Sequence, residues 1–269
     1  MKKILITAGR TTEKIDAVRG ITNFATGRLG AILARKIHHR SEVETIFFVT
    51  SEVYLIKQLA DLPKVKTYLI KTSQDLKETC ERILKMDAID LIIPTMAVSD
   101  FFVREIVSTN SFLSWITQEQ HRFTNDYLSN QNLLNEWLNQ LKDNQYQTQK
   151  ISSDQEPILF LTKAPKLITL FHEWSPKSYF VGFKLIADGT GDEIDRQWAA
   201  EVMVKNHYDL LVVNDWYKIK ESQHQALILD NDENVYQVQT KEELAEKVIS
   251  LIDQQNKGSK KVLCNHQKN

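Results

Sequence analysis

The sequence is poor in cysteine, in net charge and in long apolar runs. Cys80 and Cys264 are its two cysteines among 269 residues, too few for a disulfide framework and too far apart for a metal knuckle. Lysine and arginine total 34 against 35 acidic residues, a net charge of −1, which argues against a sequence-independent nucleic-acid binder. No apolar run approaches the roughly 18 residues of a membrane span, and no signal-peptide pattern precedes the first strand. We therefore expect a cytoplasmic protein without a membrane or nucleic-acid partner.

Short apolar runs alternate with segments of helical period along most of the chain. The predicted strands cover residues 4–7, 43–49, 65–70, 89–93, 158–161, 179–183 and 210–213. Apolar faces of the expected helices are formed by Leu29, Ile32, Leu33 and Ile37, by Leu76, Cys80, Ile83 and Leu84, and by Ile194, Trp198 and Val202. Continuous apolar strands are typical of parallel sheets buried on both faces. The order predicts an α/β fold with a doubly wound, mostly parallel Rossmann-like sheet, whose ligands bind at the carboxyl ends of its strands.

Two regions depart from this alternation. Residues 103–149 show no strand signal but carry Leu134, Trp137, Leu138 and Leu141 at helical spacing, which predicts a helical insertion. Residues 226–229 and 235–238 flank a turn and predict a C-terminal hairpin. A capping box at Thr240 then opens a final helix, with Leu244, Val248, Leu251 and Ile252 facing inward. We expect one domain over residues 1–255, with a polar flap at about 142–155, and a polar, fraying tail from Gln254 that fills 256–269.

The N-terminal loop carries the strongest signal of a site. The first strand ends at Gly9, and the next helix opens only at Gly27, after a long polar segment. This spacing fits neither the G-x-G-x-x-G dinucleotide fingerprint nor the G-K-[ST] ending of a P-loop. A glycine lets the backbone approach a ligand, and the N–H groups that open a helix favour an anion. The loop therefore indicates a phosphate site of another kind. The alternative is that it is only a structural connection between strand and helix, whose arginines are solvated.

Other candidate residues are ambiguous when each is taken alone. Asn23 is typical of a cap or turn, and Lys205 could simply complement a helix C-terminus. Asp100 follows a buried strand and could meet a ribose, a base or magnesium, or could be a surface acid. Lys150 could stabilise a triphosphate from a mobile loop, or be solvated. Phe183 could stack on a base, although core packing is the commoner role of such a residue.

Taken together, these segments resemble the phosphopantothenate–cysteine ligase family. The family pattern I-T-x-G-x-T-x-E-x-I-D-x-V-R-x-I-[TS]-N-x-[SA]-[ST]-G matches from Ile6 to Gly27, and A-V-[SA]-D-[FY] matches at 97–101. Further matches are Ala164-Pro165, Gly182-Phe183 and the K-N-x-x-D-L-[IL]-x-x-N-D element at 205–215. The matches are collinear over about residues 1–102 and 150–215, so we expect the family's fold and chemistry.

The resemblance implies a CTP-dependent ligase of coenzyme A biosynthesis. It would join 4′-phosphopantothenate and L-cysteine through an acyl-cytidylate, with Mg²⁺, as a homodimer and without a fused flavin domain. Asn23 and Lys150 would be catalytic. The implied nucleotide-binding residues are Gly9, Thr11, Met96, Ala97, Asp100, Pro165, Phe183 and Lys205, and the implied substrate-binding residues are Arg19, Thr26 and Gly27. The implied magnesium ligand is Asp100.

Three departures from the family pattern keep alternatives open. The K-I-K-K flap of many bacterial members reads Lys150-Ile151-Ser152-Ser153, Ile186 replaces an acid, and Glu201 stands where lysine is common. ATP is therefore an alternative nucleotide. An NAD(P)-dependent reductase would need a glycine-rich fingerprint and an acid about 20 residues later. A nonenzymatic nucleotide-sensing module would need no mobile flap.

Overall fold

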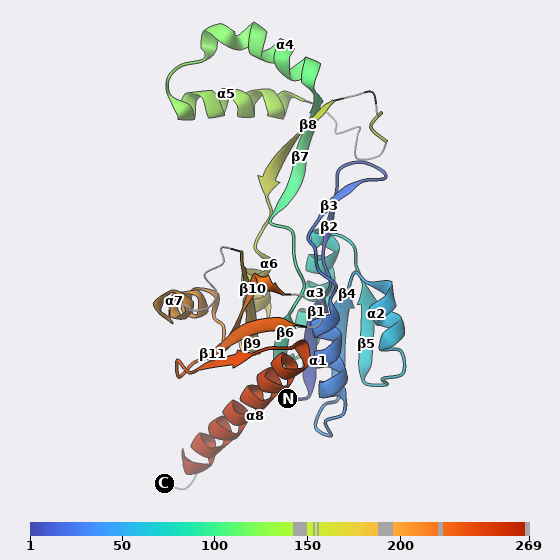
Figure 1. The fold of residues 1–269 in the computed structure, drawn as a ribbon, viewed down its shortest axis with the longest axis vertical. Coiled ribbons are helices and arrows are strands. Elements are labelled where there is room, and N and C mark those ends of the chain that lie inside the picture. The colour runs from blue at the N-terminus through green and yellow to red at the C-terminus, as the bar shows by residue number, and fades with distance from the viewer. Residues whose placement is uncertain (142–149, 153, 155, 188–195, 220–222, 267–269) are drawn as a thin grey trace. The chain divides into compact units, whose positions relative to one another are not determined.

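The computed structural model describes residues 1–141, 150–152, 154, 156–187, 196–219 and 223–266, without the side chains of residue 196 and of residues 256–266. The chain forms two compact units. The first comprises residues 1–11, 24–97 and 166–269, and the second comprises residues 12–23 and 98–165. Each unit contains its own strands, as the labels in Figure 1 show.

An eight-stranded sheet forms the centre of the first unit, in the order β12-β11-β10-β9-β6-β1-β4-β5. Its strands are β1 (Lys3–Ala8), β4 (Thr45–Thr50), β5 (Val65–Leu69), β6 (Leu91–Pro94), β9 (Tyr179–Ile186), β10 (Leu210–Ile219), β11 (His224–Asp230) and β12 (Val235–Val238). The pairs from β5 across to β10 are parallel, whereas β10-β11-β12 is antiparallel. The predicted Rossmann-like sheet and its C-terminal hairpin are confirmed.

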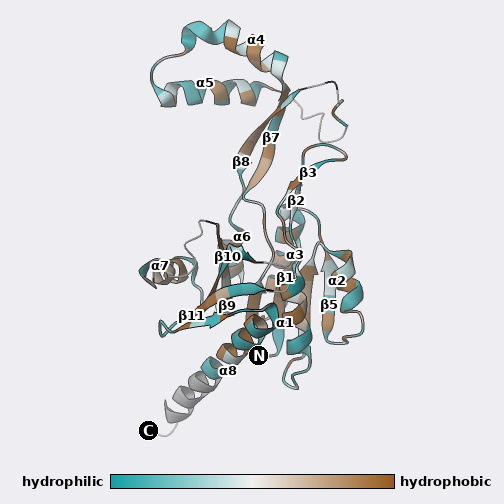
Figure 2. Ribbon diagram, in the orientation of Figure 1, coloured by the Kyte–Doolittle hydropathy of each residue, from teal (hydrophilic) through white to brown (hydrophobic). Residues whose placement is uncertain are grey.

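Six helices of the described chain belong to the first unit: α1 (Arg28–His38), α2 (Val53–Gln58), α3 (Ser73–Met86), α6 (Leu167–Trp174), α7 (Arg196–Asn206) and α8 (Lys241–His266). Helices α1 and α8 pack together, and their apolar faces join one core cluster with Ile4, Ile46 and Val212 of the sheet. Figure 2 shows brown, hydrophobic stretches along β1 and β9 beside mixed colouring on α1. The apolar faces predicted for α1 and for the start of α8 are thus buried, as expected from their spacing.

The apolar face predicted for α3 is buried as expected, and the face predicted for α7 is described in part. The buried residues of α3, Cys80 among them, lie outside that cluster, and α3 packs against α6 and β4. Burial raises the pKa of the Cys80 thiol, as expected for a core residue. Ile194 lies outside the described residues, while Trp198 and Val202 of α7 pack against the core cluster that contains Leu211 and Val213. Helix α8 continues to His266, so the fraying end expected from Gln254 is placed too early.

The second unit corrects the prediction at three places. The polar loop contains a hairpin of β2 (Thr12–Lys14) and β3 (Gly20–Thr22). The region expected to lack strands begins with β7 (Phe101–Ser108), which pairs antiparallel with β8 (Pro157–Lys163). The strand predicted at 158–161 therefore exists but does not belong to the parallel sheet. Half-exposed ribbons of this kind bury one face at most, so their apolar runs are short and mixed with polar residues.

Between β7 and β8 lie α4 (Thr109–Glu119), the short 3₁₀ helix η1 (Gln120–Arg122) and α5 (Tyr127–Gln140), which confirm the helical insertion. Aromatic rings hold this insertion together. Trp115 of α4 and Trp137 of α5 stack with centroids 4.6 Å apart and planes 13° apart. Phe112 and Phe160 add further ring contacts to the same pair. The second unit therefore has an aromatic core of its own.

Within the described chain, no helix is long and apolar enough to cross a membrane.

A buried histidine lies where the antiparallel hairpin joins the parallel sheet. His224 opens β11 and is 7% exposed, and its Nε2 lies 2.9 Å from Oδ1 of Asn214 in β10. Burial, reinforced by the positive charge of Lys241, lowers the pKa of His224 to about 4. The imidazole is therefore neutral at pH 7 and is compatible with its apolar surroundings.

We expect His224 to make the protein less stable in acid. Its folded pKa of about 4 lies below the unfolded value of about 6.5, so the unfolded chain binds more protons between these values. The contribution of neutral His224 is complete above about pH 6.5 and is lost as the pH falls toward the folded pKa. Urea unfolding from pH 7.5 to 4.5 should show a shallower pH dependence for His224→Gln than for the wild type. Equal slopes would contradict the prediction.

Candidate nucleotide site

Two glycines distant in sequence meet above the first strand of the parallel sheet. Gly9 directly follows β1 with φ 100°, and Gly27 is the N-cap of α1 with φ 69°. Both values lie in the left-handed region, which favours glycine. A Cβ on Gly27 would lie 2.6 Å from the Gly9 nitrogen, and one on Gly9 would lie 2.6 Å from Ser51 Oγ. A side chain at Gly27 would therefore push the two backbone segments apart, and one at Gly9 would collide with the Ser51 side chain.

A third glycine completes this arrangement. A Cβ on Gly30, in the first turn of α1, would lie 2.6 Å from the Ala8 Cβ and 2.7 Å from Thr95 Oγ1. The dinucleotide fingerprint uses its glycines for a tight turn, for ligand approach and for close helix–strand packing. Gly9, Gly27 and Gly30 occupy these three positions, with the segment between Gly9 and Gly27 inserted. In space the three glycines therefore resemble that fingerprint, split by the inserted segment, although the sequence spacing conceals the resemblance.

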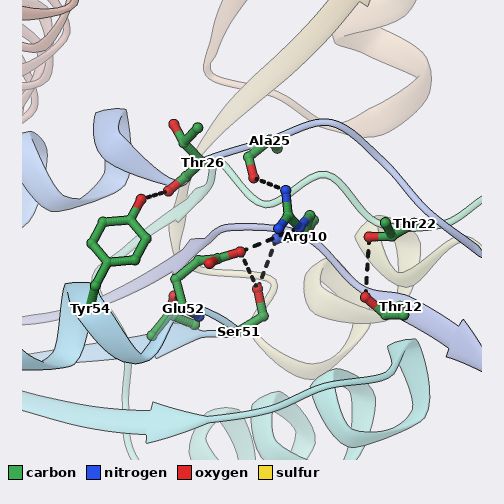
Figure 3. Close-up of polar contacts among 9 residues, drawn as sticks. Arg10, Thr12, Thr22, Ala25, Thr26, Ser51, Glu52 and Tyr54 are labelled. Atoms are coloured by element: carbon green, nitrogen blue, oxygen red, sulfur yellow. Dashed lines mark hydrogen bonds and ion pairs between the residues drawn. The ribbon is translucent and has the colours of Figure 1, made fainter. Parts of the chain in front are cut away.

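Polar contacts hold the chain leading into α1 (Figure 3). Arg10 Nη1 donates to the Ala25 carbonyl at 3.2 Å, and its backbone N–H donates to Ser51 Oγ at 3.0 Å. Its Nε lies 3.5 Å from Glu52 Oε1. The Tyr54 hydroxyl donates to the Thr26 carbonyl. These bonds fix residues 25 and 26 beside the end of β4, and leave the Thr26 side chain exposed.

The end of β1 is also bonded to the chain that follows β6. Ala97 N–H donates to the Gly9 carbonyl at 2.9 Å, and Thr11 N–H donates to the Ala97 carbonyl at 3.1 Å. Thr11 and Met96 are buried. Four predicted nucleotide-binding residues, Gly9, Thr11, Met96 and Ala97, therefore lie together at the carboxyl edge of the sheet, beside the N-terminus of α1. Unpaired N–H groups at a helix N-terminus attract phosphate.

Two other predicted nucleotide-binding residues of the first unit lie elsewhere. Phe183 sits in the middle of β9 opposite Val212 and packs against the core cluster of α1 and α8. Lys205 is exposed on the last turn of α7, which leads to the amino end of β10. The structure thus brings neither side chain to the meeting point of Gly9 and Gly27.

A cavity of about 770 Å³ lies at the amino ends of β6, β9 and β10. Its lining includes Asp90, Asp209 and the imidazoles of His172 and His207, which stack 4.3 Å apart. Helices α6 and α7 end here, and the partial negative charge of helix C-termini disfavours a phosphate. The cavity is therefore a poorer candidate site for a nucleoside triphosphate than the carboxyl edge of the parallel sheet.

The second unit holds the remaining predicted site residues. Asn23 is exposed, and its Nδ2 donates to the Val98 carbonyl at 3.1 Å. Asp100 and Pro165, at the base of the β7–β8 ribbon, are exposed, and the Asp100 carbonyl accepts from Ala164 N–H at 2.8 Å. Lys150 is also exposed. Its neighbours in the predicted flap at 142–149, 153 and 155 lie outside the described residues.

Arg19, predicted to bind substrate, is already engaged within the second unit. Its guanidinium pairs with the Asp16 carboxylate, with Nη2 2.6 Å from Oδ2. The same Nη2 donates to the Ile151 carbonyl at 2.7 Å. Arg19 therefore has a structural task, whatever else its half-exposed side chain contacts.

A magnesium site has limited support from protein side chains. In the described residues, no three histidine, cysteine, aspartate or glutamate side chains gather to hold a metal ion. Mg²⁺ commonly uses one or two carboxylates together with substrate phosphates. The exposed carboxylate of Asp100 is a hard oxygen donor of that kind, so it fits a magnesium ion brought with a nucleotide.

Sequence reasoning missed Ser51, Glu52, Tyr54 and His224. The available signal for Ser51 and Glu52 was their position directly after the buried strand β4, where ligands of open α/β sheets bind. Glu52 follows the third glycine by about the interval of the ribose-binding acid in dinucleotide sites. Here it faces Arg10 instead. A lone histidine gives no comparable signal.

Comparisons with known proteins agree with this architecture. The chain is 26% identical over 255 residues to the coenzyme A biosynthesis bifunctional protein CoaBC of Thermococcus kodakarensis, covering 94% of this chain and 51% of that protein. It thus spans about half the length of that relative. The crystal structure of the DNA/pantothenate metabolism flavoprotein from Streptococcus pneumoniae matches with a TM-score of 0.72 and 29% identity, over 94% of this chain and 99% of that one.

A second solved structure, the C-terminal domain of a coenzyme A biosynthesis bifunctional protein CoaBC, matches with a TM-score of 0.62 and 20% identity, over 96% of both chains. At that identity it shows the fold alone. The family model for the DNA/pantothenate metabolism flavoprotein C-terminal domain matches residues 1–134 and 139–255. With a sheet, a split glycine fingerprint and a family model that agree over most of its length, the chain belongs to the DNA/pantothenate metabolism flavoprotein C-terminal domain family.

Proposed function

We propose that the chain is a nucleotide-dependent ligase that joins 4′-phosphopantothenate to L-cysteine. The observation that carries the proposal is the meeting of Gly9 and Gly27 at the N-terminus of α1, at the carboxyl edge of the sheet. This geometry suits a triphosphate. The name of the Thermococcus relative supports a place in coenzyme A biosynthesis. A cytoplasmic location, expected from the sequence, belongs to the same proposal.

The proposed reaction has two balanced steps. A carboxylate is a poor acylating agent, so its oxygen first attacks the α-phosphorus of the nucleotide and displaces pyrophosphate. The product is a mixed anhydride of the acid and the nucleoside monophosphate. The cysteine amine then attacks the acyl carbon, forms the amide, loses a proton and releases the monophosphate. Positioning and charge neutralisation dominate such phosphorus chemistry, and backbone N–H groups, hydroxyls and lysines can supply both.

The proposal gives a few residues of the candidate site a task in this scheme. The N-terminus of α1 at Gly27, beside Gly9, would cradle phosphates, with the exposed Thr26 hydroxyl next to it. The Ala97 backbone, bonded to Gly9 and Thr11, would hold the end of β1 in place. Asp100 would hold Mg²⁺, which neutralises phosphate charge when bound. Lys150 would stabilise charge that develops on the phosphates during pyrophosphate release. Asn23 would serve the attack of the amine, since an amide group can both donate and accept hydrogen bonds.

We propose CTP as the nucleotide, because the Ile6–Gly27 and Ala97–Asp100 segments match the bacterial pattern of the ligase family. Pyrophosphate release should require 4′-phosphopantothenate together with CTP, and product should require cysteine as well. Pyrophosphate release with ATP and not with CTP would make ATP the nucleotide and would leave the proposed ligation unchanged. Thermal stabilisation by NAD(P) instead of either nucleotide would favour the reductase alternative.

Lys150→Gln should slow pyrophosphate release while the fold stays intact. A charge-assisted contact made mainly in the transition state contributes about 10²–10³ in rate. Single-turnover kinetics would measure the loss, and circular dichroism would check the fold. Near-normal turnover would show that Lys150 is a solvated surface residue without a role in catalysis.

Asn23→Asp should still release pyrophosphate but stall before amide formation. A carboxylate cannot donate to the developing oxyanion, so the acyl-nucleotidylate should accumulate. Mass spectrometry of the quenched reaction should detect this intermediate without product. Loss of pyrophosphate release would move Asn23 to the first step or to the fold of its loop, and normal turnover would leave it a turn residue.

We also propose a homodimer formed through the second unit. The apolar residues of the β11–β12 hairpin, such as Ile228 and Val238, are already buried in the first unit and need no partner. In contrast, β8 pairs with β7 alone among the described strands, and Leu159 and Leu161 on it are 37% and 47% exposed. Light scattering at micromolar concentration should give twice the chain mass, and Leu161→Lys should give a monomer. An active wild-type monomer would reject the dimer.

A further inference from the structure

Ile151, the residue directly after Lys150, is held at three points within the second unit. Its N–H donates to Asp16 Oδ2 at 3.1 Å, and its carbonyl accepts from Arg19 Nη2 at 2.7 Å. Its side chain is 2% exposed and lies in a cluster with Val103 and Ile106 of β7. The backbone and side chain of this one residue are thus fixed together.

Asp16 is the centre of this anchor. The residue is 1% exposed, yet its carboxylate accepts five hydrogen bonds or ion-pair contacts from its surroundings. Oδ1 accepts from the N–H groups of Val18 and Arg19 at 2.9 and 2.7 Å, and Oδ2 accepts from Arg19 Nε at 2.9 Å and from Ile151. Burial alone would raise the pKa of Asp16, but the bonds from Arg19, Val18 and Ile151 hold it below its usual range. The carboxylate stays ionised.

The anchor reaches Lys150 through the peptide bond. The N–H that Asp16 accepts belongs to the peptide unit that joins Lys150 to Ile151. Because this unit is planar, fixing its N–H and the following residue also fixes the Cα of Lys150. The Lys150 side chain is exposed while Ile151 is buried, so the two point in different directions. The buried Asp16 carboxylate therefore fixes the backbone position from which the exposed Lys150 side chain extends.

We propose that Asp16 is a positioning residue for Lys150. The inference rests on the proposed function, since it gives Lys150 its task in pyrophosphate release. Asp16 touches no reacting atom and acts by holding the Lys150–Ile151 peptide unit, assisted by Arg19. A misplacement of about 1 Å can lower a rate by up to about 10²-fold. A loosened anchor should therefore lower the rate even though Lys150 itself is not substituted.

The first test is a double-mutant cycle on pyrophosphate release. Asp16→Asn keeps the shape of the side chain but removes its charge, and should lower kcat at least tenfold with little change in the KM for CTP. In the Lys150→Gln background the same substitution should have almost no further effect, because both changes act on one group. Independent, multiplying losses in the double variant would assign Asp16 to general stability and overturn the proposal.

A matched control separates positioning from stability. Asp126 is another carboxylate of the second unit; it caps α5 by accepting the Ser129 N–H at 2.8 Å. Asp126→Asn keeps the capping oxygen but removes a negative charge that favours the N-terminus of α5, so it should lower the melting temperature modestly, with kcat unchanged. An equal kcat loss in Asp126→Asn and Asp16→Asn would also count against the proposal.

Hydrogen exchange gives a readout that does not depend on turnover. The Ile151 amide should exchange at least tenfold faster in Asp16→Asn than in the wild type, and at the wild-type rate in Asp126→Asn. Unchanged exchange in Asp16→Asn would reject the anchor even if the ligase proposal holds. Absence of pyrophosphate release from the wild type, with either CTP or ATP, would instead reject the proposed function.

Discussion

The contact between the Gly9 and Gly27 backbones is the constraint on which the first unit depends. It brings the end of β1 to the start of α1 so closely that a Cβ on Gly27 would overlap the Gly9 nitrogen. Both residues adopt positive φ, which costs other residues energy. Gly30 then lets α1 pack against β1 and Thr95. The helix N-terminus consequently faces the carboxyl edge of the sheet, where backbone N–H groups can meet phosphate.

The segment between these glycines shows how the fold accepts an insertion while the two glycine backbones stay in contact. Arg10 and Tyr54 bind the carbonyls of Ala25 and Thr26, so the chain returns to a defined position before α1 begins. The inserted residues form the β2–β3 hairpin of the second unit, whose turn carries Asp16 and Arg19. Within that unit, Asp16 and Arg19 bind the backbone of Ile151, far along the chain. Ordered polar contacts thus begin and end the insertion.

Burial separates the polar groups of this protein into two kinds. Asp16 is buried and ionised because five donor contacts compensate its desolvation. His224 is buried and neutral because burial, reinforced by the positive charge of Lys241, lowers its pKa. Asn23, Asp100 and Lys150, the residues proposed to meet the ligands, are instead exposed. Asp16 thus holds backbone N–H groups, and His224 contacts the side chain of Asn214.

The sequence by itself determined the parallel sheet, the hairpin after β10, the inward faces of α1 and α8, and the family motifs at Gly9–Gly27 and Ala97–Asp100. Continuous apolar runs and helical spacing are local signals, and each reports burial directly. Tertiary structure alone decided that Gly9, Gly27 and Gly30 form one fingerprint, that β7 pairs with β8 outside the main sheet, and that Arg19 binds Ile151. These contacts join residues distant in the chain, and pairing partners of half-exposed strands and charged side chains leave no periodic trace in the sequence.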